Sequence, residues 1–379
     1  MMVPQYASII PTITWTADLQ YENDKGVQKA IAQPPQCPQA LQGAANRNPF
    51  LANGTGGHGL HKHQSAGVAP TDTPISEDCL FINVQYPGNT VSSTKLPVLV
   101  YIHGRGYILG GANLYDGTFL IEESNQEAIL VVMQYRLGLF GFLAGDEVEK
   151  NGDLNVGLLD QSFVLRWVRA HISKFGGDPN KLRFGGNPLV SSGSGGSVLQ
   201  QVIAENGKTS PQLFHTAIAS SPYLPAQYKY DDKIPMTLYK QVVDGVNCTS
   251  AHDALACPRQ TDTKALQTIN SNINAAGFYG SFNFVPVVDG KFITQRPTKS
   301  MRQGKVNGDM YVNNATTPLS AGSFASQLSP TLKSKQMAEI DSLYKDLGPP
   351  LDQENLVVGE SLFVCPTYYL RLSRAPLTR

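Results

Sequence analysis

Serines and glycines cluster in the stretch KLRFGGNPLVSSGSGGSVLQQ, residues 181–201. A strand-like run enters this stretch and a helical pattern follows it, which is the setting of both a phosphate-binding loop and a nucleophile elbow. A phosphate-binding loop continues from its glycines into Lys and then Ser or Thr, whereas Gly196 is followed here by Ser197 and Val198. The sequence therefore gives little support to phosphate binding.

A serine nucleophile sits on a strained turn, which the pattern Gly-x-Ser-x-Gly permits because a glycine stands two residues to either side of the serine. Ser194 has Gly196 two residues after it, but Ser192 stands two residues before it. Ser192 itself has no glycine at either of these positions. Ser192 and Ser194 are therefore the candidate nucleophiles, and neither completes the motif.

A second glycine-rich loop, YIHGRGYILGG at residues 101–111, follows the strand-like run LPVLV. Its glycines do not have the spacing of a dinucleotide-binding turn, and the strand-like run about 20 residues later ends in Gln134 rather than in an acid. Glycines at the end of a strand instead allow backbone N–H groups to approach a developing oxyanion. We interpret this loop, which also carries His103, as a candidate oxyanion loop; a plain tight turn is the alternative.

Strand-like and helical segments alternate from residue 79 onward and would position these loops. CLFINVQY, LPVLVYIH and AILVVMQYR predict strands, and LLDQSFVLRWVRAHISKF has apolar residues at helical spacing. KLRFGG, SVLQQVIAE and FHTAIASSP then predict a strand, a helix and a strand. This alternation predicts an α/β fold with a mostly parallel central sheet, whose functional loops lie at the carboxyl ends of the strands. Beyond residue 222 the pattern is mainly helical and predicts covering segments.

We divide the chain into a loop-rich N-terminal segment, residues 1–76, and an α/β domain, residues 77–379. The first segment is rich in Gly, Pro, Gln and Asn, a composition typical of loops. His58, His61 and His63 lie in it without nearby acidic partners, so we expect no metal site there.

A serine nucleophile also needs a base. In α/β enzymes with a nucleophile elbow, the base is a histidine that follows the serine and the acid along the chain. Only His215 and His252 follow the serine-rich stretch. His215 opens a predicted strand at its amino end, away from the catalytic edge, and His252 lies in a predicted surface loop. We expect neither to be the catalytic base.

Composition narrows the possible partners. The 379 residues include 41% hydrophobic and 16% charged residues, which is typical of a globular protein. The 30 basic and 30 acidic residues balance, so nothing indicates binding to nucleic acid or to an anionic membrane. No uncharged apolar run reaches the roughly 18 residues that a membrane-spanning helix needs, and we recognise no secretory signal at the N-terminus.

Cysteines and sequons point to an extracellular protein. The five cysteines are compatible with two sequential disulfides and one thiol left over, or with five buried thiols. Three N-x-S/T sequons favour the secreted alternative. They begin at Asn53, Asn247 and Asn314.

Several stretches closely resemble the type-B carboxylesterase/lipase family, which has the α/β-hydrolase fold. They are SEDCLFINVQYP, LPVLVYIHGRGYILGGANLYDG, VVMQYRLGLFGFLAGDE, DLNVGLLDQSFVLRWVRAHISKFGGDPNKL and GSVLQQVIA. LFHTAIASSPYLPAQYKYDD and NINAAGFYGSFNFVPVVDGKFITQRP are most similar to secreted fungal members, including carotenoid ester lipase-like proteins. The resemblance covers about residues 77 to 370.

The resemblance implies hydrolysis of small-molecule or lipid carboxylic esters through a serine acyl-enzyme, by a secreted enzyme without metal or cofactor. It implies oxyanion donors at Gly104, Arg105, Gly106 and Gly193. It also implies two disulfides and one buried ion pair. These are Cys37–Cys79, Cys248–Cys257 and Arg136–Asp160.

The catalytic residues depart from the family pattern. Arg105 stands at the middle glycine of the family's H-G-G-G loop, and NPLV, residues 187–190, resembles an insertion in the elbow. We expect the strand after Asp309 that carries the family's catalytic acid to be missing, and the family's histidine to be absent before the chain ends at Arg379. We therefore expect an incomplete α/β-hydrolase domain, truncated at the C-terminus, that hydrolyses esters poorly or not at all. A non-catalytic binding protein and a truncated or mis-spliced esterase are the alternatives.

Overall fold

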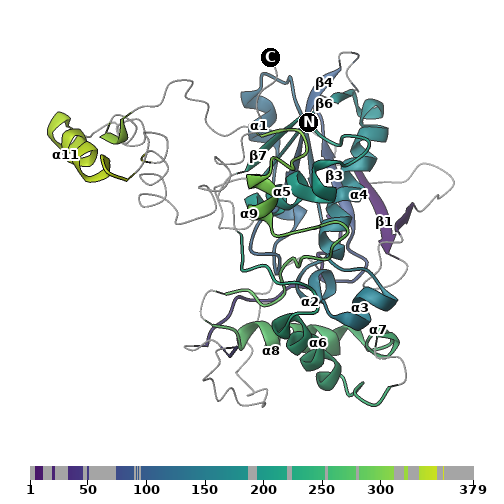
Figure 1. The fold of residues 1–379 in the computed structure, drawn as a ribbon. Coiled ribbons are helices and arrows are strands. Elements are labelled where there is room, and N and C mark those ends of the chain that lie inside the picture. The colour runs from purple at the N-terminus through teal and green to yellow at the C-terminus, as the bar shows by residue number, and fades with distance from the viewer. Residues whose placement is uncertain are drawn as a thin grey trace.

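An eight-stranded sheet lies at the centre of the described part of the chain (Figure 1). This computed structural model describes residues 5–11, 19–21, 33–45, 49–50, 74–88, 91, 93, 95–186, 194–219, 224–251, 255–278, 281–310, 320–322, 333–347 and 353. The strands are β1 (Gln5–Pro11), β2 (Leu19–Tyr21), β3 (Phe81–Gln85), β4 (Leu96–Ile102), β5 (Ile129–Met133), β6 (Gly177–Gly186), β7 (Thr216–Ala219) and β8 (Asp309–Met310).

The strand order is β2-β1-β3-β5-β4-β6-β7-β8. Strands β5, β4, β6, β7 and β8 pair in parallel, whereas β2, β1 and β3 join the edge of the sheet in antiparallel pairs. Parallel neighbours need crossover connections, and helices supply them here. The α/β fold with a mostly parallel sheet that the sequence predicts is confirmed.

The N-terminal segment, which we expected to form loops, contributes two strands to this sheet. β1 pairs with β3, and β2 pairs with β1. The outer side of β3 presents a row of backbone N–H and C=O groups, and a paired strand satisfies them more fully than a loop does. Composition did not indicate this, because the pairing partner of β1 lies more than 70 residues further along the chain.

A short strand at residues 309 and 310 ends the described sheet. β8 pairs in parallel with β7, with Thr216 opposite Asp309 and Ala217 opposite Met310. Residues 311–319 lie outside the described residues. The expected loss of the strand after Asp309 therefore stays a prediction.

Helices connect the strands and cover the sheet. They are α1 (Thr118–Glu123), α2 (Gly138–Phe142), α3 (Asp146–Asn151), α4 (Val156–His171), α5 (Ser194–Ile203), α6 (Lys233–Gly245), α7 (Ala256–Arg259), α8 (Thr263–Ala275), α9 (Pro297–Arg302) and α11 (Ser334–Tyr344), with 3₁₀ turns η1 (Ala112–Leu114), η2 (Ile172–Phe175) and η3 (Ala204–Gly207). Of the helices that the structure describes, none has the length and apolar character that crossing a membrane requires.

The core lies on both faces of the sheet. Along β5, Val131 and Met133 join the large core cluster, whereas Leu130 and Val132 join a small cluster with Tyr101. Side chains alternate between the two faces of a strand, so an uninterrupted apolar run such as ILVVM is buried on both. The apolar positions of α4 and α5 belong to the large cluster.

Helices α2, α6 and α8 lie at the carboxyl ends of the parallel strands, below the sheet in Figure 1. α2 follows β5 after a short connection, which places it at this edge. α6 and α8 are covering helices of the kind that the sequence predicts beyond residue 222, and α2 belongs to the connection after β5. They enclose the edge where the functional loops begin. In contrast, α11 has no buried residue and lies apart from the sheet (Figure 1).

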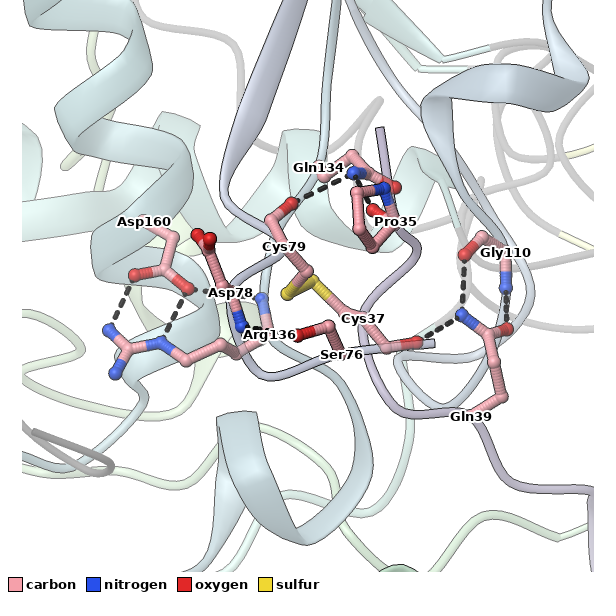
Figure 2. The surroundings of a disulfide bond; sticks show 10 residues. All are labelled: Pro35, Cys37, Gln39, Ser76, Asp78, Cys79, Gly110, Gln134, Arg136 and Asp160. Atoms are coloured by element: carbon pink, nitrogen blue, oxygen red, sulfur yellow. Dashed lines mark hydrogen bonds and ion pairs between the residues drawn. A yellow bond between two sulfur atoms is a disulfide. The ribbon is translucent and has the colours of Figure 1, made fainter. Parts of the chain in front are cut away.

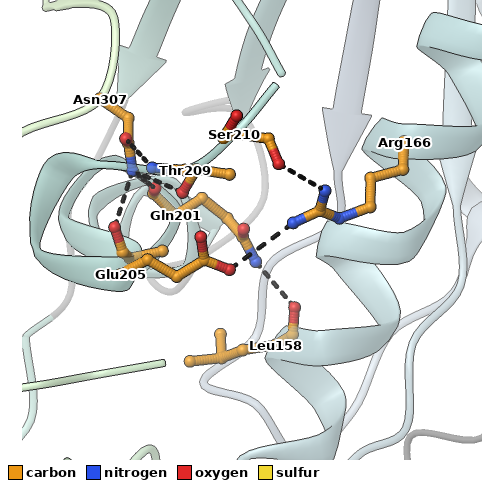
Figure 3. Close-up of polar contacts among 8 residues, drawn as sticks. Leu158, Arg166, Gln201, Glu205, Thr209, Ser210 and Asn307 are labelled. Carbon is orange, nitrogen blue, oxygen red and sulfur yellow. Dashed lines mark hydrogen bonds and ion pairs between the residues drawn. The ribbon is translucent and has the colours of Figure 1, made fainter. Parts of the chain in front are cut away.

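The carboxyl-terminal end of α5 is held by two amide side chains (Figure 3). Asn307 donates through Nδ2 to the backbone oxygens of Gln201 at 3.2 Å and Ala204 at 2.9 Å. Gln201 donates through Nε2 to the backbone oxygen of Leu158 in α4 at 2.8 Å. Carbonyl groups in the last turn of a helix lack helical partners, so these bonds fix the end of α5. The orientation of the helix that follows the serine-rich stretch is thereby set.

Candidate functional site

The two candidate loops begin at the same edge of the sheet. β4 and β6 are parallel neighbours, with Val100 opposite Phe184 and Tyr101 opposite Gly185. The glycine loop, residues 103–110, follows β4, and the serine-rich stretch follows β6. Carboxyl ends of adjacent parallel strands lie side by side, which is where α/β proteins bind ligands.

The serine-rich stretch joins a strand to a helix, which is the setting that an elbow needs. β6 ends at Gly186 and α5 begins at Ser194. Of Ser194 the structure describes the backbone. Ser192 and Gly193 lie outside the described residues. Their role as nucleophile and oxyanion donor therefore stays a prediction.

The glycine loop has an unusual backbone conformation. Arg105, Gly106 and Tyr107 have φ angles of 79°, 68° and 67°. The left-handed region costs a residue with a side chain roughly 1–2 kcal/mol. Arg105 thus stands at the position that the resemblance assigns to a glycine, in a conformation that favours glycine. Its backbone N–H is retained, and its side chain is half-buried.

His103 is buried at the start of this loop. Its ring stacks on Tyr135, with the centroids 4.5 Å apart, and Nδ1 lies 3.3 Å from the backbone oxygen of Gly104. Burial lowers the pKa of His103 from 6.5 to about 4; the hydrogen bond to the Gly104 carbonyl opposes this change and the charge of Arg105 adds to it. A Cβ atom on Gly110 would lie 2.6 Å from Nδ1. His103 is therefore a neutral residue that packs against the loop.

A buried polar chain joins the loop to α5 and α4. The hydroxyl of Tyr135 donates to the backbone oxygen of His103 at 3.0 Å. Burial raises the pKa of Tyr135, and a hydrogen bond with Ser197 lowers it in part. Ser197, in α5, accepts a hydrogen bond from Nε2 of Gln161, in α4, at 3.1 Å. The start of α5 and the glycine loop therefore share one network.

An apolar cavity of about 180 Å³ lies beside the glycine loop. Most of its described lining comes from α2, α6, residues 225–228 and residues 278–287, with Phe50 and Ala144 beside them. The lining includes Phe142, Leu238 and Phe282 but no Lys, Arg, Asp or Glu. Phe282 also contacts the loop, because a Cβ atom on Gly106 would lie 2.5 Å from its ring. Through Phe282, the wall of an apolar cavity therefore touches the glycine loop.

Both disulfides that the resemblance implies are present in the structure. Cys37 is bonded to Cys79, and Cys248 to Cys257. The first joins Cys79, which lies just before β3, to Cys37, whose segment lies beside the glycine loop (Figure 2). The second closes a short loop after α6.

The implied ion pair between Arg136 and Asp160 is present and buried (Figure 2). Nη2 of Arg136 lies 2.6 Å from Oδ1 of Asp160, and Nε lies 2.9 Å from Oδ2. The backbone N–H of Arg136 donates to Oδ2 at 3.0 Å. Since Arg136 follows β5 and Asp160 lies in α4, this pair fixes the helix to the carboxyl end of the sheet.

The remaining candidates for acid and base lie elsewhere. His215 precedes β7 and bonds through its backbone to Leu182, so it is at the amino end of the strand, as expected. Asp309 pairs with Thr216, the first residue of β7, and is at the same end. His171 ends α4 against Trp167. His58, His61, His63 and His252 lie outside the described residues.

In the described ranges, no group of three or more His, Cys, Asp or Glu side chains is placed to hold a metal ion.

Sequence reasoning did not single out the residues that join the two loops. Tyr135, Gln161 and Ser197 come from different elements, and no spacing relates them. Phe282 lies in the aromatic stretch GFYGSFNFVP, which is visible in the sequence. Nothing in that stretch indicates that one ring contacts Gly106.

Known proteins resemble this chain over most of its length. A sequence model described as the carboxylesterase family matches residues 19–342. The chain is 36% identical over 248 residues to secreted triacylglycerol lipase LIP1 of Gibberella zeae, which covers 63% of this chain and 42% of that protein. It is 32% identical over 294 residues to secreted lipase 1 of Botryotinia fuckeliana, covering 74% of this chain and 48% of that protein. The chain thus spans less than half the length of these curated relatives.

Solved structures show the same fold. The crystal structure of Aspergillus niger EstA has a TM-score of 0.69 and 28% sequence identity, and covers 98% of this chain and 70% of that one. The structure described as PNB esterase has a TM-score of 0.64 at 24% identity, over 96% of this chain and 73% of that one, and supports the fold alone. Since the family match extends over most of its 379 residues, this chain belongs to the carboxylesterase family.

Proposed function

We propose that this chain carries a site for hydrolysis of small-molecule or lipid carboxylic esters and turns these esters over weakly. The observation that carries the proposal is the contact of Phe282 with Gly106. It supports the proposal because Phe282 belongs to the wall of an apolar cavity, suited to the acyl or alcohol part of an ester, and also touches the glycine loop. Membership of the carboxylesterase family supports the same chemistry.

The reaction uses a serine from the stretch between β6 and α5. The hydroxyl oxygen of Ser192 or Ser194 attacks the ester carbonyl carbon, and its proton passes to a base and then to the leaving alcohol as the C–O bond breaks. Water then attacks the acyl-enzyme and releases the carboxylic acid. The candidates that stabilise the oxyanion are the backbone N–H groups of residues 104, 105 and 106 in the glycine loop and of Gly193 in the serine-rich stretch.

We expect weak turnover because none of the described histidines is placed to act as the catalytic base. Of the three described histidines, His215 and His171 lie away from the carboxyl edge, and His103 is buried with a pKa lowered to about 4. Loss of one member of a catalytic triad costs on the order of 10⁴-fold, and the serine attack that remains is then assisted only by binding and the oxyanion site. We therefore expect residual hydrolysis.

An ester assay tests this proposal. Purified, monodisperse protein is given p-nitrophenyl esters of increasing chain length, with an intact esterase of the same family as reference. We expect turnover far below the reference that falls further in Ser192→Ala or Ser194→Ala. Turnover within tenfold of the reference and abolished by one of these changes contradicts weak catalysis. Activity that survives both changes contradicts the serine mechanism.

Binding without turnover is the second candidate function. The apolar cavity supports it, since its described lining has no charged side chain. In this case a non-hydrolysable ester analogue binds to the wild type, and Phe282→Ala weakens the binding, while no hydrolysis is measured. Calorimetry that detects no binding of the analogue contradicts it.

We also propose that the protein is secreted and glycosylated. Two disulfides support an oxidising compartment, and two similar fungal lipases are described as secreted. Asn247 begins a sequon and is exposed at the end of α6. Recovery from the medium of the source organism, with a mass that falls after glycosidase treatment and falls by less in Asn247→Gln, is the expected result. Recovery only from the cell interior contradicts it.

A further inference from the structure

The side chain of Gln39 pairs with both backbone groups of Gly110, the residue that ends the glycine loop (Figure 2). Oε1 of Gln39 accepts from the Gly110 N–H at 2.6 Å, and Nε2 donates to the Gly110 oxygen at 2.8 Å. Nε2 also donates to the Cys37 oxygen at 2.8 Å. Next to it, the backbone N–H of Ala40 donates to the oxygen of Ile108 at 2.7 Å. Gln39 is buried.

The segment that carries Gln39 is anchored independently of the glycine loop. The disulfide from Cys37 to Cys79 ties it to the stretch before β3. Nε2 of Gln134 donates to the oxygens of Pro35 and Cys79, each at 2.8 Å. Backbone bonds of Gln36 add to these contacts. Gln39 therefore projects from a fixed support towards the loop.

The glycine loop needs such a support. Its three successive left-handed residues, 105–107, include two with side chains, so the conformation is not the one that the isolated segment favours. Gly110 itself has a φ of 110° and lies against His103. Hydrogen bonds from a fixed amide offset this strain and hold the loop in one arrangement.

The same segment also contacts a covering helix. Asn270, in α8, donates through Nδ2 to the backbone oxygen of Gln39 at 3.5 Å and accepts from the N–H of Leu139 at 3.0 Å. Gln267 donates to the same oxygen of Gln39. The glycine loop and α8 are therefore fixed to one point.

We infer that Gln39 is a positioning residue, which acts through Gly110 to hold the backbone N–H groups of the glycine loop where an ester oxyanion develops. This inference rests on the proposed ester hydrolysis. Oxyanion donors stabilise a transition state only when their position is set in advance, and a displacement of about 1 Å can cost on the order of 100-fold in rate.

Gln39→Leu tests the inference, with Gln85→Leu as the matched control. Gln85 is another buried glutamine whose Oε1 accepts from a glycine N–H, that of Gly117 at 2.6 Å, and it lies beside the amino end of β5. We expect Gln39→Leu to lower kcat about 10- to 100-fold with KM within threefold, and to raise deuterium exchange in residues 103–111 at least tenfold. Gln85→Leu is expected to change neither quantity more than threefold after correction for global stability.

A second variant, Gln39→Glu, separates positioning from packing. A protonated carboxyl group has one acceptor and one O–H donor and so reproduces the pairing with Gly110, whereas a carboxylate places charge beside two carbonyl oxygens. We expect exchange of residues 103–111, normalised to the intrinsic rate at each pH, to approach that of the wild type as the pH falls. The ratio of variant to wild-type kcat is expected to rise in parallel.

The outcomes distinguish this inference from the proposed function. Exchange of residues 103–111 that is the same in Gln39→Leu as in Gln85→Leu, or that shows no pH dependence in Gln39→Glu, overturns the positioning role. Faster exchange with unchanged kcat overturns it as well, because the loop is then held without consequence for the reaction. A wild type without turnover contradicts ester hydrolysis, and the exchange measurements then decide whether Gln39 holds the loop.

Discussion

The ring of Phe282 lies against Gly106 so closely that a Cβ atom added to this glycine would come within 2.5 Å of two ring atoms. Phe282 belongs to the wall of the apolar cavity, and Gly106 belongs to the glycine loop at the end of β4. Phe282 therefore lies between the cavity and the loop. A larger side chain at residue 106 is therefore expected to displace the ring of Phe282.

Gly106→Ala is expected to be more destabilising than an alanine at a glycine of similar conformation in open space. Gly304 is the control, since its φ is 65° and a Cβ atom there meets nothing within 4 Å. Both changes incur the left-handed cost of about 1–2 kcal/mol. Only Gly106→Ala adds the displacement of Phe282, which we expect to cost about 1–3 kcal/mol more. Urea denaturation measures both, and equal losses would show that Phe282 moves freely.

Arg105→Gly is expected to stabilise the fold by up to about 1 kcal/mol. Glycine removes the left-handed cost of about 1–2 kcal/mol but increases the entropy of the unfolded chain by about 0.5–1 kcal/mol. Ester turnover should not fall, because the backbone N–H remains. Arg183→Gly, at an exposed position in β6, is the control and should be destabilising. A lower urea midpoint for Arg105→Gly would mean that its side chain contributes more than the strain costs.

Asp160→Ala is expected to lower the free energy of unfolding by about 3–5 kcal/mol, since it leaves the guanidinium of Arg136 buried without its carboxylate. The two side chains are 4% and 1% exposed, so water does not replace the lost partner. Asp244→Ala breaks the exposed pair with Lys240 in α6 and should shift the denaturation midpoint little. Similar shifts for the two variants would contradict a structural role of the buried pair.

His103 makes stability depend on pH. Its pKa is lowered from 6.5 to about 4 in the folded protein, so the unfolded chain binds the proton more readily between these values. Stability from this group is complete above the unfolded pKa and is lost as the pH falls towards 4, by about 3 kcal/mol in total. The urea midpoint of His103→Phe should depend less on pH between 7 and 4 than that of the wild type. His215→Gln, at an exposed position, should keep the wild-type profile.

The order of the central elements could be predicted from the sequence. Runs such as LPVLVYIH and AILVVMQYR became β4 and β5, and LLDQSFVLRWVRAH became α4, because apolar periodicity is local and survives in any fold that buries it. β1 and β8 escaped prediction. Their pairing depends on edges that other strands supply, and β8 has only two residues.

The candidate site was predicted in its parts but not in its assembly. Residue types and spacing singled out the glycine loop and the serine-rich stretch, and the parallel neighbours β4 and β6 bring both to one edge. The resemblance to a family supplied the disulfides and the pair of Arg136 and Asp160. Arg105 was visible as a departure from that family, but its φ of 79° was not.

The sequence by itself determined the α/β class and the two loops, and it singled out Ser192 and Ser194 as candidates, since these depend on local composition and on strand and helix periodicity. Only the tertiary structure decided that Phe282 lies against Gly106 and that Gln39 is hydrogen-bonded to Gly110, 71 residues away. The physical reason is that these contacts depend on how distant segments pack around the sheet. No local sequence pattern indicates which distant side chain will fill the space beside a glycine.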